Sequence, residues 1–414
     1  MNPLRGLRPG KVLTATTAAV ALTFLAACTD ESDSASSESG VAQPSASFPG
    51  NTAAGTPIKI GLINNEGGQA ISEPDNRMAA EAAAEYANDQ LGGIGGHPIE
   101  LVTCLNAEEP ASARDCANRM VESEVSAVVV TTTGQGDILV PIITGADIPY
   151  VSAAGQSMQE LTSDNSFLWS GGFPSSLQAM AQHAKSEGMQ NVTAYTIDVP
   201  AAVSGLQSFG KAAFEANGVA LEIVTIPPGT PDSTPQVSAG LADSPEGVVI
   251  VGEGTLCTSA LKSLGTLGYS GEKMGIQACA TPDIVASVGP SIDGTKIFTA
   301  AMTSGDDPEA QLYRSVIEQY NPDTDISGYA YVGYQGVLGL VRATASLDGT
   351  DTSPAAVSAA IRSARDVVLP AGDGLTFTCD GSANPQLPAV CGKGSVVATL
   401  EDGTLTDASV VGGQ

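Results

Sequence analysis

The sequence predicts an α/β protein built from two doubly wound parallel sheets. From residue 57 onward, short runs of β-branched residues alternate with amphipathic helical stretches, and this alternation is typical of parallel sheets covered by helices. At about 350 residues, the folded part is also longer than the size at which a single hydrophobic core stops growing. We therefore expect two lobes, each with its own sheet.

The first set of elements indicates one complete doubly wound sheet. Its first helix ends at Leu91-Gly92-Gly93, and glycine commonly ends helices because it adopts the left-handed backbone conformation without strain. The expected strands are 58–63, 98–104, 127–130 and 149–153, and the expected helices are 74–89, 110–121 and 138–144.

The second set repeats this alternation. Its expected strands are 191–197, 220–226, 248–251 and 273–278, and its expected helices are 177–187, 205–217 and 259–267. Further along come a strand at 296–302, helices at 308–320, 328–347 and 354–364, and strand-like segments at 375–378 and 396–405. Because these elements are left over after two complete sheets, we expect the chain to return to both lobes.

The N-terminal residues have the pattern of an export signal. Three basic residues precede an apolar run that ends in Leu25-Ala26-Ala27-Cys28. The run is too short to span a bilayer, which takes about 20 mostly apolar residues. The segment resembles the signal of bacterial lipoproteins, and this implies cleavage before Cys28 and acylation of that residue, for example by palmitate. A plain secreted protein with an incidental cysteine is the alternative.

The residues after Cys28 predict a flexible tether. Up to about residue 56 the chain consists mainly of Ser, Ala, Gly, Pro and acidic residues, with Phe48 as its one aromatic residue. Such a stretch cannot bury enough apolar surface to offset the entropy of ordering it. We therefore expect a signal peptide at 1–27 and a lipid-bearing, disordered segment at 28–56 that holds the folded part at a membrane.

The charge of the chain excludes some partners. The formal net charge is −28 at pH 7, and the signal peptide removes only positive residues. Nucleic acid is not an expected partner, because binding phosphates requires a basic surface. An acidic surface mainly favours solubility, and it does not predict the charge of a ligand, since a buried site can differ from the exterior.

The cysteines indicate an oxidising compartment. The chain has seven, and six remain after Cys28, an even number suited to disulfides. Six cysteines allow about 15 pairings. Their order favours neighbours, namely Cys104 with Cys116, Cys257 with Cys279, and Cys379 with Cys391. The competing interpretation is a metal site, but there is no Cys-x-x-Cys and the only histidines are His97 and His183. We expect no metal and no cofactor.

Three segments carry a family resemblance. The strand Ile58-Lys59-Ile60-Gly61-Leu62-Ile63 is the first, and the second runs from Asn88 through Leu91-Gly92-Gly93-Ile94 to Gly96-His97-Pro98-Ile99. The third joins Ile148-Pro149-Tyr150-Val151-Ser152 to Glu160-Leu161-Thr162. Together they resemble the leucine/isoleucine/valine-binding family of solute receptors, which serve ABC importers, over about residues 57 to 345. Asn65-Glu66-Gly67-Gly68 and the cysteine pairs resemble the actinobacterial members.

The resemblance implies a type 1 periplasmic binding protein, with two Rossmann-like lobes joined by a hinge of three crossovers. The implied lobes are 57–172 plus about 299–350, and 173–298 plus about 351–414. In open parallel sheets, ligands bind at the carboxyl ends of strands, where helix N-termini present free N–H groups. A carboxylate-bearing ligand suits that place, and hinge closure around it excludes water.

The resemblance also implies ligand-binding residues. Gln135 aligns nearest to the family's serine for the ligand carboxylate, and Gln156 and Ser157 align with its Ala-Thr pair. Tyr331 and Tyr334 belong to a stretch that resembles the family's aromatic residues beside the crevice, and Glu66 is a candidate pocket acid after the first strand. The alternative for each position is an ordinary polar loop residue or, for the tyrosines, a core residue.

Two departures from the family argue against an α-amino-acid ligand. Ala201-Ala202-Val203 stand where the family has Tyr-Gly, and residues 278–280 lack its acid. The sequence nevertheless predicts a lipid-anchored, monomeric receptor on the extracytoplasmic face of the cell membrane. We expect it to capture a small polar solute, such as an amino acid or a related amide or carboxylate, for an ABC permease. The alternative is a sensor or envelope interaction protein of the same fold.

Catalysis is not expected. Ser259-x-x-Lys262 and Ser163-Asp164-Asn165 are similar to motifs of penicillin-recognising serine enzymes. Their order along the chain is reversed, however, and the Lys-Thr-Gly motif is absent. With two histidines and no paired base and nucleophile, a hydrolase is the third and least favoured hypothesis.

Overall fold

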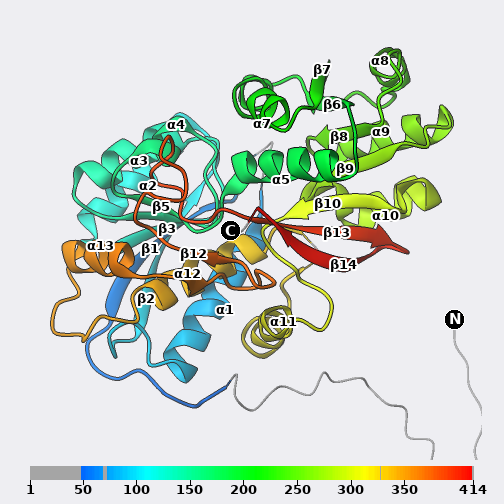
Figure 1. Cartoon of the computed structure of the whole chain (residues 1–414). Coiled ribbons are helices and arrows are strands. Elements are labelled where there is room, and N and C mark those ends of the chain that lie inside the picture. The colour runs from blue at the N-terminus through cyan, green and yellow to red at the C-terminus, as the bar shows by residue number, and fades with distance from the viewer. Residues whose placement is uncertain (1–47, 69–71, 327, 413–414) are drawn as a thin grey trace, which may run out of the picture. The chain divides into compact units, whose positions relative to one another are not determined.

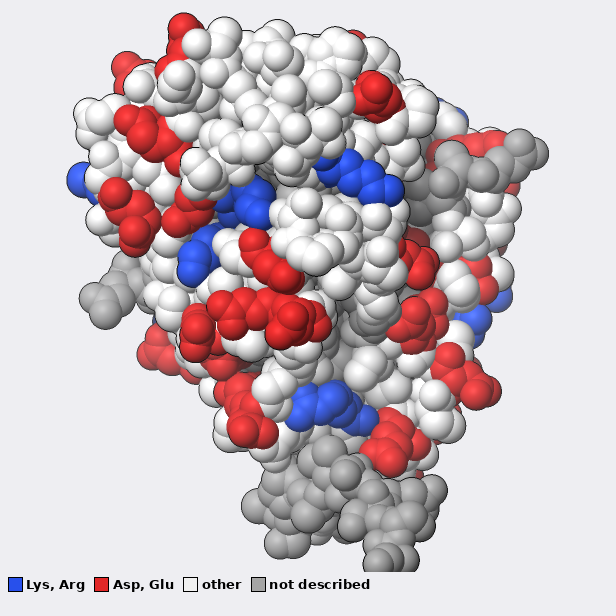
Figure 2. Space-filling model, turned by 90° about the vertical axis from the view of Figure 1, so that its right-hand side faces the viewer, with Lys and Arg blue, Asp and Glu red and all other residues white. Residues whose placement is uncertain are grey.

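The computed structural model describes residues 48–68, 72–326 and 328–412 (Figure 1). The predicted signal peptide, Cys28 and most of the predicted tether lie outside these ranges. No helix within them has both the length and the apolar character needed to cross a membrane. The surface is acidic, as the net charge of −28 requires, and Figure 2 shows Asp and Glu side chains gathered across one face with smaller groups of Lys and Arg among them.

The first sheet has five parallel strands in the order β2-β1-β3-β4-β5. Apolar side chains alternate between its two faces, so that Ala127 and Val129 enter one hydrophobic core while Val128 and Val130 enter another. The strands are β1 (Ile58–Asn65), β2 (Ile99–Asn106), β3 (Ala127–Val130), β4 (Tyr150–Ser152) and β5 (Ser166–Leu168).

Helices from two distant parts of the chain cover this sheet. The first group follows its strands, and the second group comes from beyond residue 300 (Figure 1). They are α1 (Pro74–Gln90), α2 (Pro110–Glu122), α3 (Gly136–Gly145), α4 (Met158–Thr162), α11 (Pro308–Tyr320), α12 (Tyr331–Ala343) and α13 (Pro354–Ser363). Helices α1 and α12 lie side by side, and their backbones approach closely because Gly333 of α12 faces the carbonyl of Asn76 in α1.

The second sheet has seven strands in the order β14-β13-β10-β9-β8-β6-β7. Its strands are β6 (Asn191–Ile197), β7 (Ala220–Ile226), β8 (Gly247–Val251), β9 (Glu272–Ile276), β10 (Thr295–Thr299), β13 (Ser395–Glu401) and β14 (Thr404–Val411). Strands β6 to β10 are parallel, while β13 pairs antiparallel with β10, and β14 antiparallel with β13. The sheet is therefore mixed at one edge.

Helical segments of the second unit connect its parallel strands. They are α5 (Gly172–Ser186), α6 (Pro200–Gly205), η2 (Leu206–Gly210), α7 (Lys211–Ala216), α8 (Thr234–Gly240), α9 (Gly254–Thr266), η3 (Gln277–Ala280), α10 (Pro282–Val288) and η4 (Gly289–Ile292). The expected helix at 205–217 is thus longer at its start and contains the π-helical turn η2. The seven-stranded sheet of the second unit has an apolar core on each face. The two doubly wound α/β units expected from the sequence are therefore confirmed.

The chain passes between the two units three times, after β5, after β10 and before β13. The first and third passages touch, because the Cys391 N–H donates to the Leu168 carbonyl at 2.9 Å. A Cβ on Gly392 would lie 2.6 Å from the Trp169 carbonyl oxygen, so only glycine fits there. The amide of Gln335 in α12 donates to the carbonyls of Ala300 and Pro370 at 2.9 and 2.8 Å and so holds the second passage.

Trp169 fixes the first passage in the core. Its side chain is fully buried, stacks on Phe377 with ring centroids 4.8 Å apart, and donates from Nε1 to the Gly336 carbonyl. Phe377 belongs to β12 (Thr376–Phe377), which pairs with β11 (Val367–Val368) in a small two-stranded sheet. This tryptophan therefore serves the packing of the crossover.

The boundary of the second lobe differs from the expected one. Residues from about 351 were expected there, but α13 buries Val357 and Ile361 in the core of the first unit. Val390 also bridges to Leu168 at the end of β5. The chain reaches the second sheet only at β13, where the expected strand at 396–405 is instead a hairpin of two strands. These contacts are between residues distant in sequence, so local patterns do not reveal them.

The end of the predicted tether is also ordered, which corrects its boundary at residue 56. The Phe48 ring packs edge-on against Tyr86 of α1, with centroids 5.4 Å apart. The N–H groups of Asn51 and Ala53 donate to the carbonyls of Gln90 and Asn88. One aromatic ring and a few backbone hydrogen bonds are enough to hold this polar segment on the end of α1.

Three disulfides lie in the described part of the chain, and each joins the neighbours expected from their order. Cys104–Cys116 links β2 to α2, Cys257–Cys279 links α9 to η3, and Cys379–Cys391 links the segment after β12 to the third passage. Each one closes a short segment of chain.

Candidate functional site

The carboxyl ends of the strands in the first sheet form a buried polar edge. Asn64 and Asn65 end β1, and Thr131 follows β3; all three are at least 97% buried. The Thr131 hydroxyl donates to Asn64 Oδ1 at 2.8 Å, and Asn106 at the end of β2 donates to Asn65 Oδ1 at 3.3 Å. Ligands of open parallel sheets bind at this edge, so the loops that follow its strands are the candidate binding loops.

Glu66, in the loop after β1, forms an ion pair. Arg77 of α1 donates from Nε to its carboxylate at 2.8 Å and also binds Glu81 at 2.9 Å. The hydrogen bond from Arg77 lowers the pKa of Glu66, which is therefore ionised and neutralised at pH 7. The loop after β1 thus offers neither a free acid at Glu66 nor a free guanidinium at Arg77.

The loop after β3 is organised by Glu108, which precedes α2. The Glu108 carboxylate accepts hydrogen bonds from the Thr133 hydroxyl at 2.7 Å and from the Gly134 N–H at 2.8 Å. The Gln135 N–H donates to Thr133 Oγ1, and the Gln135 side-chain amide donates to the Glu108 carbonyl at 3.3 Å. The donors of this loop therefore face a carboxylate of the protein itself.

The loop after β4 is organised in the same way by Glu160. The N–H groups of Gln156 and Ser157 donate to its Oε2 at 3.0 and 2.9 Å, and the Tyr150 hydroxyl donates to its Oε1 at 2.6 Å. Ser157 accepts from the Glu160 N–H and completes a capping box at the start of α4. Burial raises the pKa of Glu160, while these hydrogen bonds oppose that shift. The Gln156 side chain itself is exposed.

Replacing Ser157 with alanine is expected to lower the free energy of unfolding by about 1 kcal/mol, because the cap of α4 is lost. Chemical denaturation of the ligand-free protein measures this loss. Ser157→Thr keeps a capping hydroxyl and is the control. Equal stability of Ser157→Ala and the wild type would contradict the capping role.

Glu73 is a candidate site residue that the sequence analysis missed. Its carboxylate accepts from the Thr132 hydroxyl at 2.8 Å and from the Asn76 side chain at 3.0 Å, both at Oε2. It forms no ion pair with any residue of the described ranges. Burial raises the pKa of Glu73, and the Glu108 carboxylate adds a smaller increase. The only sequence signal is an acid before the proline that starts α1.

Two tyrosines connect this edge to the second unit. Tyr329 and Tyr331 have ring centroids 6.0 Å apart, and the charge of Glu73 contributes to the raised pKa of both hydroxyls. Burial is the main cause and brings the pKa of Tyr331 to about 12. The Tyr331 hydroxyl lies near the side chain of Thr299 in β10, and the Tyr329 hydroxyl lies near the backbone of Ala278 in η3, and both neighbours oppose the rise in pKa.

Tyr334 lies apart from this pair. Its fully buried ring packs against Tyr313 of α11 with centroids 4.9 Å apart, and its hydroxyl has no hydrogen-bond partner among the described residues. The structure thus brings Tyr331 to Glu73 and Tyr329, and Gln135 to Glu108. It places Tyr334 in the packing between α11 and α12.

The second unit contributes Gln277, which neither the composition nor the resemblance indicated. It is the first residue of η3, directly after β9, and its side chain is 7% exposed. Its Oε1 has no hydrogen-bond partner in the described part of the chain. The next residue, Ala278, is the one that contacts Tyr329. Residues 201–203, where the family resemblance placed Tyr-Gly, lie in α6.

The motifs considered for catalysis form no catalytic group. Ser259 is buried in α9 and donates to the Leu256 carbonyl, while the Lys262 ammonium donates to the Ser287 hydroxyl at 2.9 Å. Asn165 is in the first unit, where it accepts from Ser358 of α13. The two motifs therefore belong to different sheets. Within the described ranges, no group of three or more His, Cys, Asp and Glu side chains is arranged to hold a metal ion.

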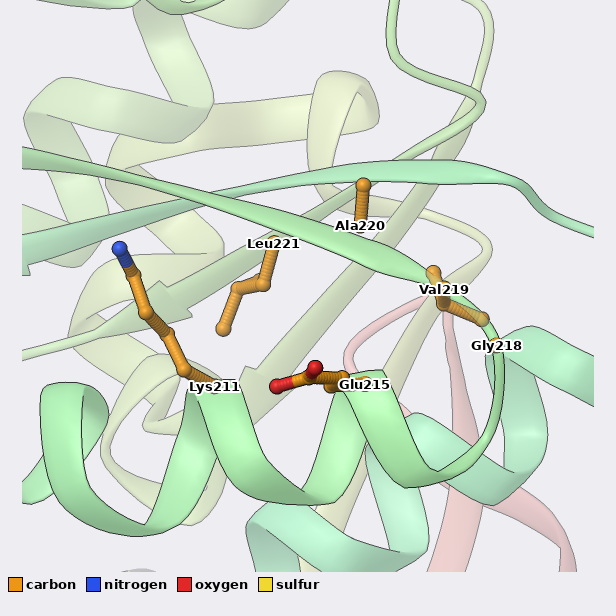
Figure 3. Close-up of a pocket in the computed structure, with 6 residues that line it drawn as sticks. All are labelled: Lys211, Glu215, Gly218, Val219, Ala220 and Leu221. Carbon is orange, nitrogen blue, oxygen red and sulfur yellow. The ribbon is translucent and has the colours of Figure 1, made fainter.

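Two surface pockets lie elsewhere. One of about 350 Å³ lies between α7 and β7, where Lys211 and Glu215 project from the helix beside Leu221 (Figure 3). The other, of about 450 Å³, is lined by residues 51–54, 91–96 and 341–347. The first pocket lies beside the beginning of β7 and the second beside the beginning of β2. Both are at the amino ends of these strands, opposite the carboxyl ends where such sheets bind ligands.

Comparison with solved structures shows the same fold. The leucine binding protein LivK from Thermotoga maritima is 19% identical, with a TM-score of 0.69 and an alignment that covers 86% of this chain and 99% of that one. LivJ from Streptococcus pneumoniae, solved with isoleucine, is 18% identical with a TM-score of 0.69 over 86% and 100% of the two chains. A fatty acid ABC transporter substrate-binding protein from Thermomonospora curvata is 17% identical, with a TM-score of 0.70 over 91% and 95%.

Comparison of sequences gives the family. No curated protein matches the chain. The sequence profile of the periplasmic binding protein family, in contrast, matches residues 57–393. That match covers both sheets up to the third passage, and the structure has the two doubly wound units and the multiple crossovers that the fold requires. This chain belongs to the periplasmic binding protein family.

Proposed function

We propose that this protein is the extracytoplasmic substrate-binding component of an ABC importer. The observation that carries the proposal is the polar edge of the first sheet, which meets η3 and β10 of the second unit through Tyr329 and Tyr331. A solute held there contacts both units, so closing the hinge around it is favoured by the contacts that each unit supplies.

The proposed partners are a small solute and a permease in the membrane. The sequence Leu25-Ala26-Ala27-Cys28 supports anchoring to the extracytoplasmic face of the membrane through acylated Cys28. The protein acts as a monomer in this proposal and does not transform its cargo. The solved structures do not define the solute, because LivJ was solved with isoleucine whereas another structure of the same fold is a fatty acid transporter component.

The residues predicted from the sequence have two kinds of role in the proposed site. Gln135, Gln156, Ser157 and Tyr331 lie in or beside the loops of the polar edge and are proposed to contact the solute. Glu66 is proposed to support the site by holding Arg77, and Tyr334 by packing α12 against Tyr313.

Purified protein lacking residues 1–28 tests the proposal. We expect mass spectrometry of small molecules released on denaturation to find one chemically intact compound in a 1:1 ratio. Adding it back is expected to lower the radius of gyration in small-angle scattering. Lys211→Ala, in the pocket of Figure 3, is the control and should leave binding unchanged. An altered product would favour a hydrolase, and binding without compaction would favour an interaction protein.

A further inference from the structure

We infer that the solute of this site is a cation that presents an ammonium group to Glu73 and carries no carboxylate. This inference rests on the proposed function and specifies its substrate class. It departs from the carboxylate-bearing ligand that the family resemblance implies.

Donors in the loops after β3 and β4 that could bind a ligand carboxylate are already occupied by carboxylates of the protein. In the loop after β3, the N–H of Gly134 and the hydroxyl of Thr133 donate to Glu108. In the loop after β4, the N–H groups of Gln156 and Ser157 donate to Glu160. A ligand carboxylate would have to displace a carboxylate of the protein and would lie close to its charge, which is unfavourable at short distance.

The polar groups that remain available beside this edge are acceptors. Thr132 and Asn76 both donate to Oε2 of the Glu73 carboxylate, and no ion pair to this carboxylate occurs within residues 48–68, 72–326 and 328–412. Arg77, the cation of the same helix, is held by Glu66 and Glu81. In η3 of the second unit, beside Ala278, the buried Oε1 of Gln277 has no donor among the described residues. A solute with several N–H donors satisfies such a set.

Two tyrosine rings, with centroids 6.0 Å apart, lie within electrostatic range of Glu73. Tyr329 and Tyr331 lie close enough to Glu73 for its charge to raise the pKa of their hydroxyls, so both stay neutral at pH 7. An ammonium over such a ring gains roughly 0.5–2 kcal/mol from cation–π attraction, in addition to its ion pair. A carboxylate gains nothing from the ring faces, which carry partial negative charge.

Matched pairs of compounds, measured by calorimetry at pH 7, test the inference. The probes are 3-methylbutylamine with leucine, putrescine with ornithine, and choline with glycine betaine, because each pair differs mainly by a carboxylate. Small molecules from yeast extract are also separated on ion exchangers into cationic, neutral and anionic fractions. The effect of each fraction on the melting temperature of the protein is then measured. We expect stabilisation by the cationic fraction and tighter binding of the carboxylate-free member of any pair that binds.

Glu73→Gln is the decisive variant. It keeps the oxygen that accepts from Thr132 and Asn76 but removes the charge, and we expect it to weaken amine binding at least about 10-fold. Glu85→Gln makes the same chemical change on the exposed face of α1 and should bind like the wild type. Glu73→Gln also distinguishes a binding role of Glu73 from a purely structural one. A purely structural role would mean that the substitution lowers the stability of the protein without changing its selectivity for amines.

The pH dependence gives an independent readout. The titratable groups that interact with Glu73 are Glu108 and the neutral tyrosines Tyr329 and Tyr331, and burial raises the pKa of Glu73 above 4.5. A raised folded-state pKa means that its favourable contribution to stability is complete below pH 4.5 and is lost as the pH rises through that pKa. The ligand-free Glu73→Gln protein should therefore be at least as stable as the wild type at pH 7, while amine binding to the wild type increases over the same rise in pH.

The outcomes separate the two levels of the proposal. Stabilisation only by the neutral or anionic fraction, or tighter binding of the carboxylate-bearing member of a pair, would overturn the cationic solute and leave the binding function intact. So would equal amine affinity in Glu73→Gln and the wild type. Stabilisation by none of the three fractions would overturn the proposed function together with this inference.

Discussion

Gly333→Ala is expected to lower the free energy of unfolding by about 3 kcal/mol. A Cβ at this position would lie 1.7 Å from the carbonyl oxygen of Asn76 and 3.1 Å from the N of Ala80, both backbone atoms of α1. Neither neighbour is a flexible side chain, so α1 and α12 must move apart along their contact. Overpacking of this kind costs about 1–3 kcal/mol or more, which exceeds the gain of up to about 1 kcal/mol from alanine's higher helix propensity.

Gly145→Ala is the matched control for this substitution. Gly145 ends α3, is exposed, and has no heavy atom within 4 Å of an added Cβ. This change should be neutral or slightly stabilising. Denaturant titration of both variants measures the difference, and a Gly333→Ala protein as stable as Gly145→Ala would show that the two helices are not in close contact.

Removing the disulfide between α9 and η3 is expected to have an effect of similar size. Cys257 and Cys279 are 22 residues apart in sequence, and both side chains are fully buried. Opening a loop of this size costs about 3 kcal/mol in the chain-entropy model. The Cys257→Ala/Cys279→Ala variant should therefore unfold at lower denaturant concentration. Because η3 also carries Gln277 and Ala278, the affinity of the double variant for an amine should fall as well.

Reduction of the wild type provides the control for this variant. The buried sulfurs should react with dithiothreitol only after the second unit opens, so brief treatment of the folded protein should leave this pair intact. When the wild type has been unfolded and reduced, and a count of free thiols confirms the reduction, its free energy of unfolding should be lowered by at least as much as in the double variant. A fully reduced protein that keeps wild-type stability would contradict the prediction.

The main elements could be predicted from the sequence because their patterns are local. The strands at 127–130, 191–197 and 220–226 and the helix at 308–320 have the expected bounds, since a β-branched run or an apolar helical face extends over their whole length. Short elements were missed, among them β5, α4 and α8. These three segments lack a β-branched run or an apolar helical face, so their structure depends on the sheet or cap that each one joins.

The assignment of segments to lobes required contacts between distant residues. Helix α13 has an ordinary amphipathic pattern, and nothing in it indicates that Ser358 binds Asn165, which is 193 positions away. The turn of the hairpin β13–β14 at Asp402-Gly403 is a local hairpin signal that the sequence analysis did not use, but the antiparallel pairing of β13 with β10 is a contact between distant segments. Pairing across long loops is decided by tertiary packing, which local sequence patterns do not contain.

The candidate site was predictable in position but not in chemistry. The loops after β3 and β4 were expected to contribute, and the resemblance led to Gln135, Gln156 and Ser157. The sequence could not reveal that Glu108 occupies the N–H of Gly134, because that carboxylate comes from the segment after a different strand. Ser157-x-x-Glu160, in contrast, is a local capping-box pattern that the sequence analysis did not use. Glu73 was missed because surface loops commonly carry acids.

The ordered segment before β1 determines where a mechanical load enters the molecule. Phe48 and the backbone of residues 51–54 are fastened to the end of α1 and the turn after it. Any pull transmitted along the chain to Phe48 is borne by these bonds and by the first sheet behind them. The three passages to the second sheet lie outside that path, so a force applied at Phe48 does not have to bend the joints between the two sheets.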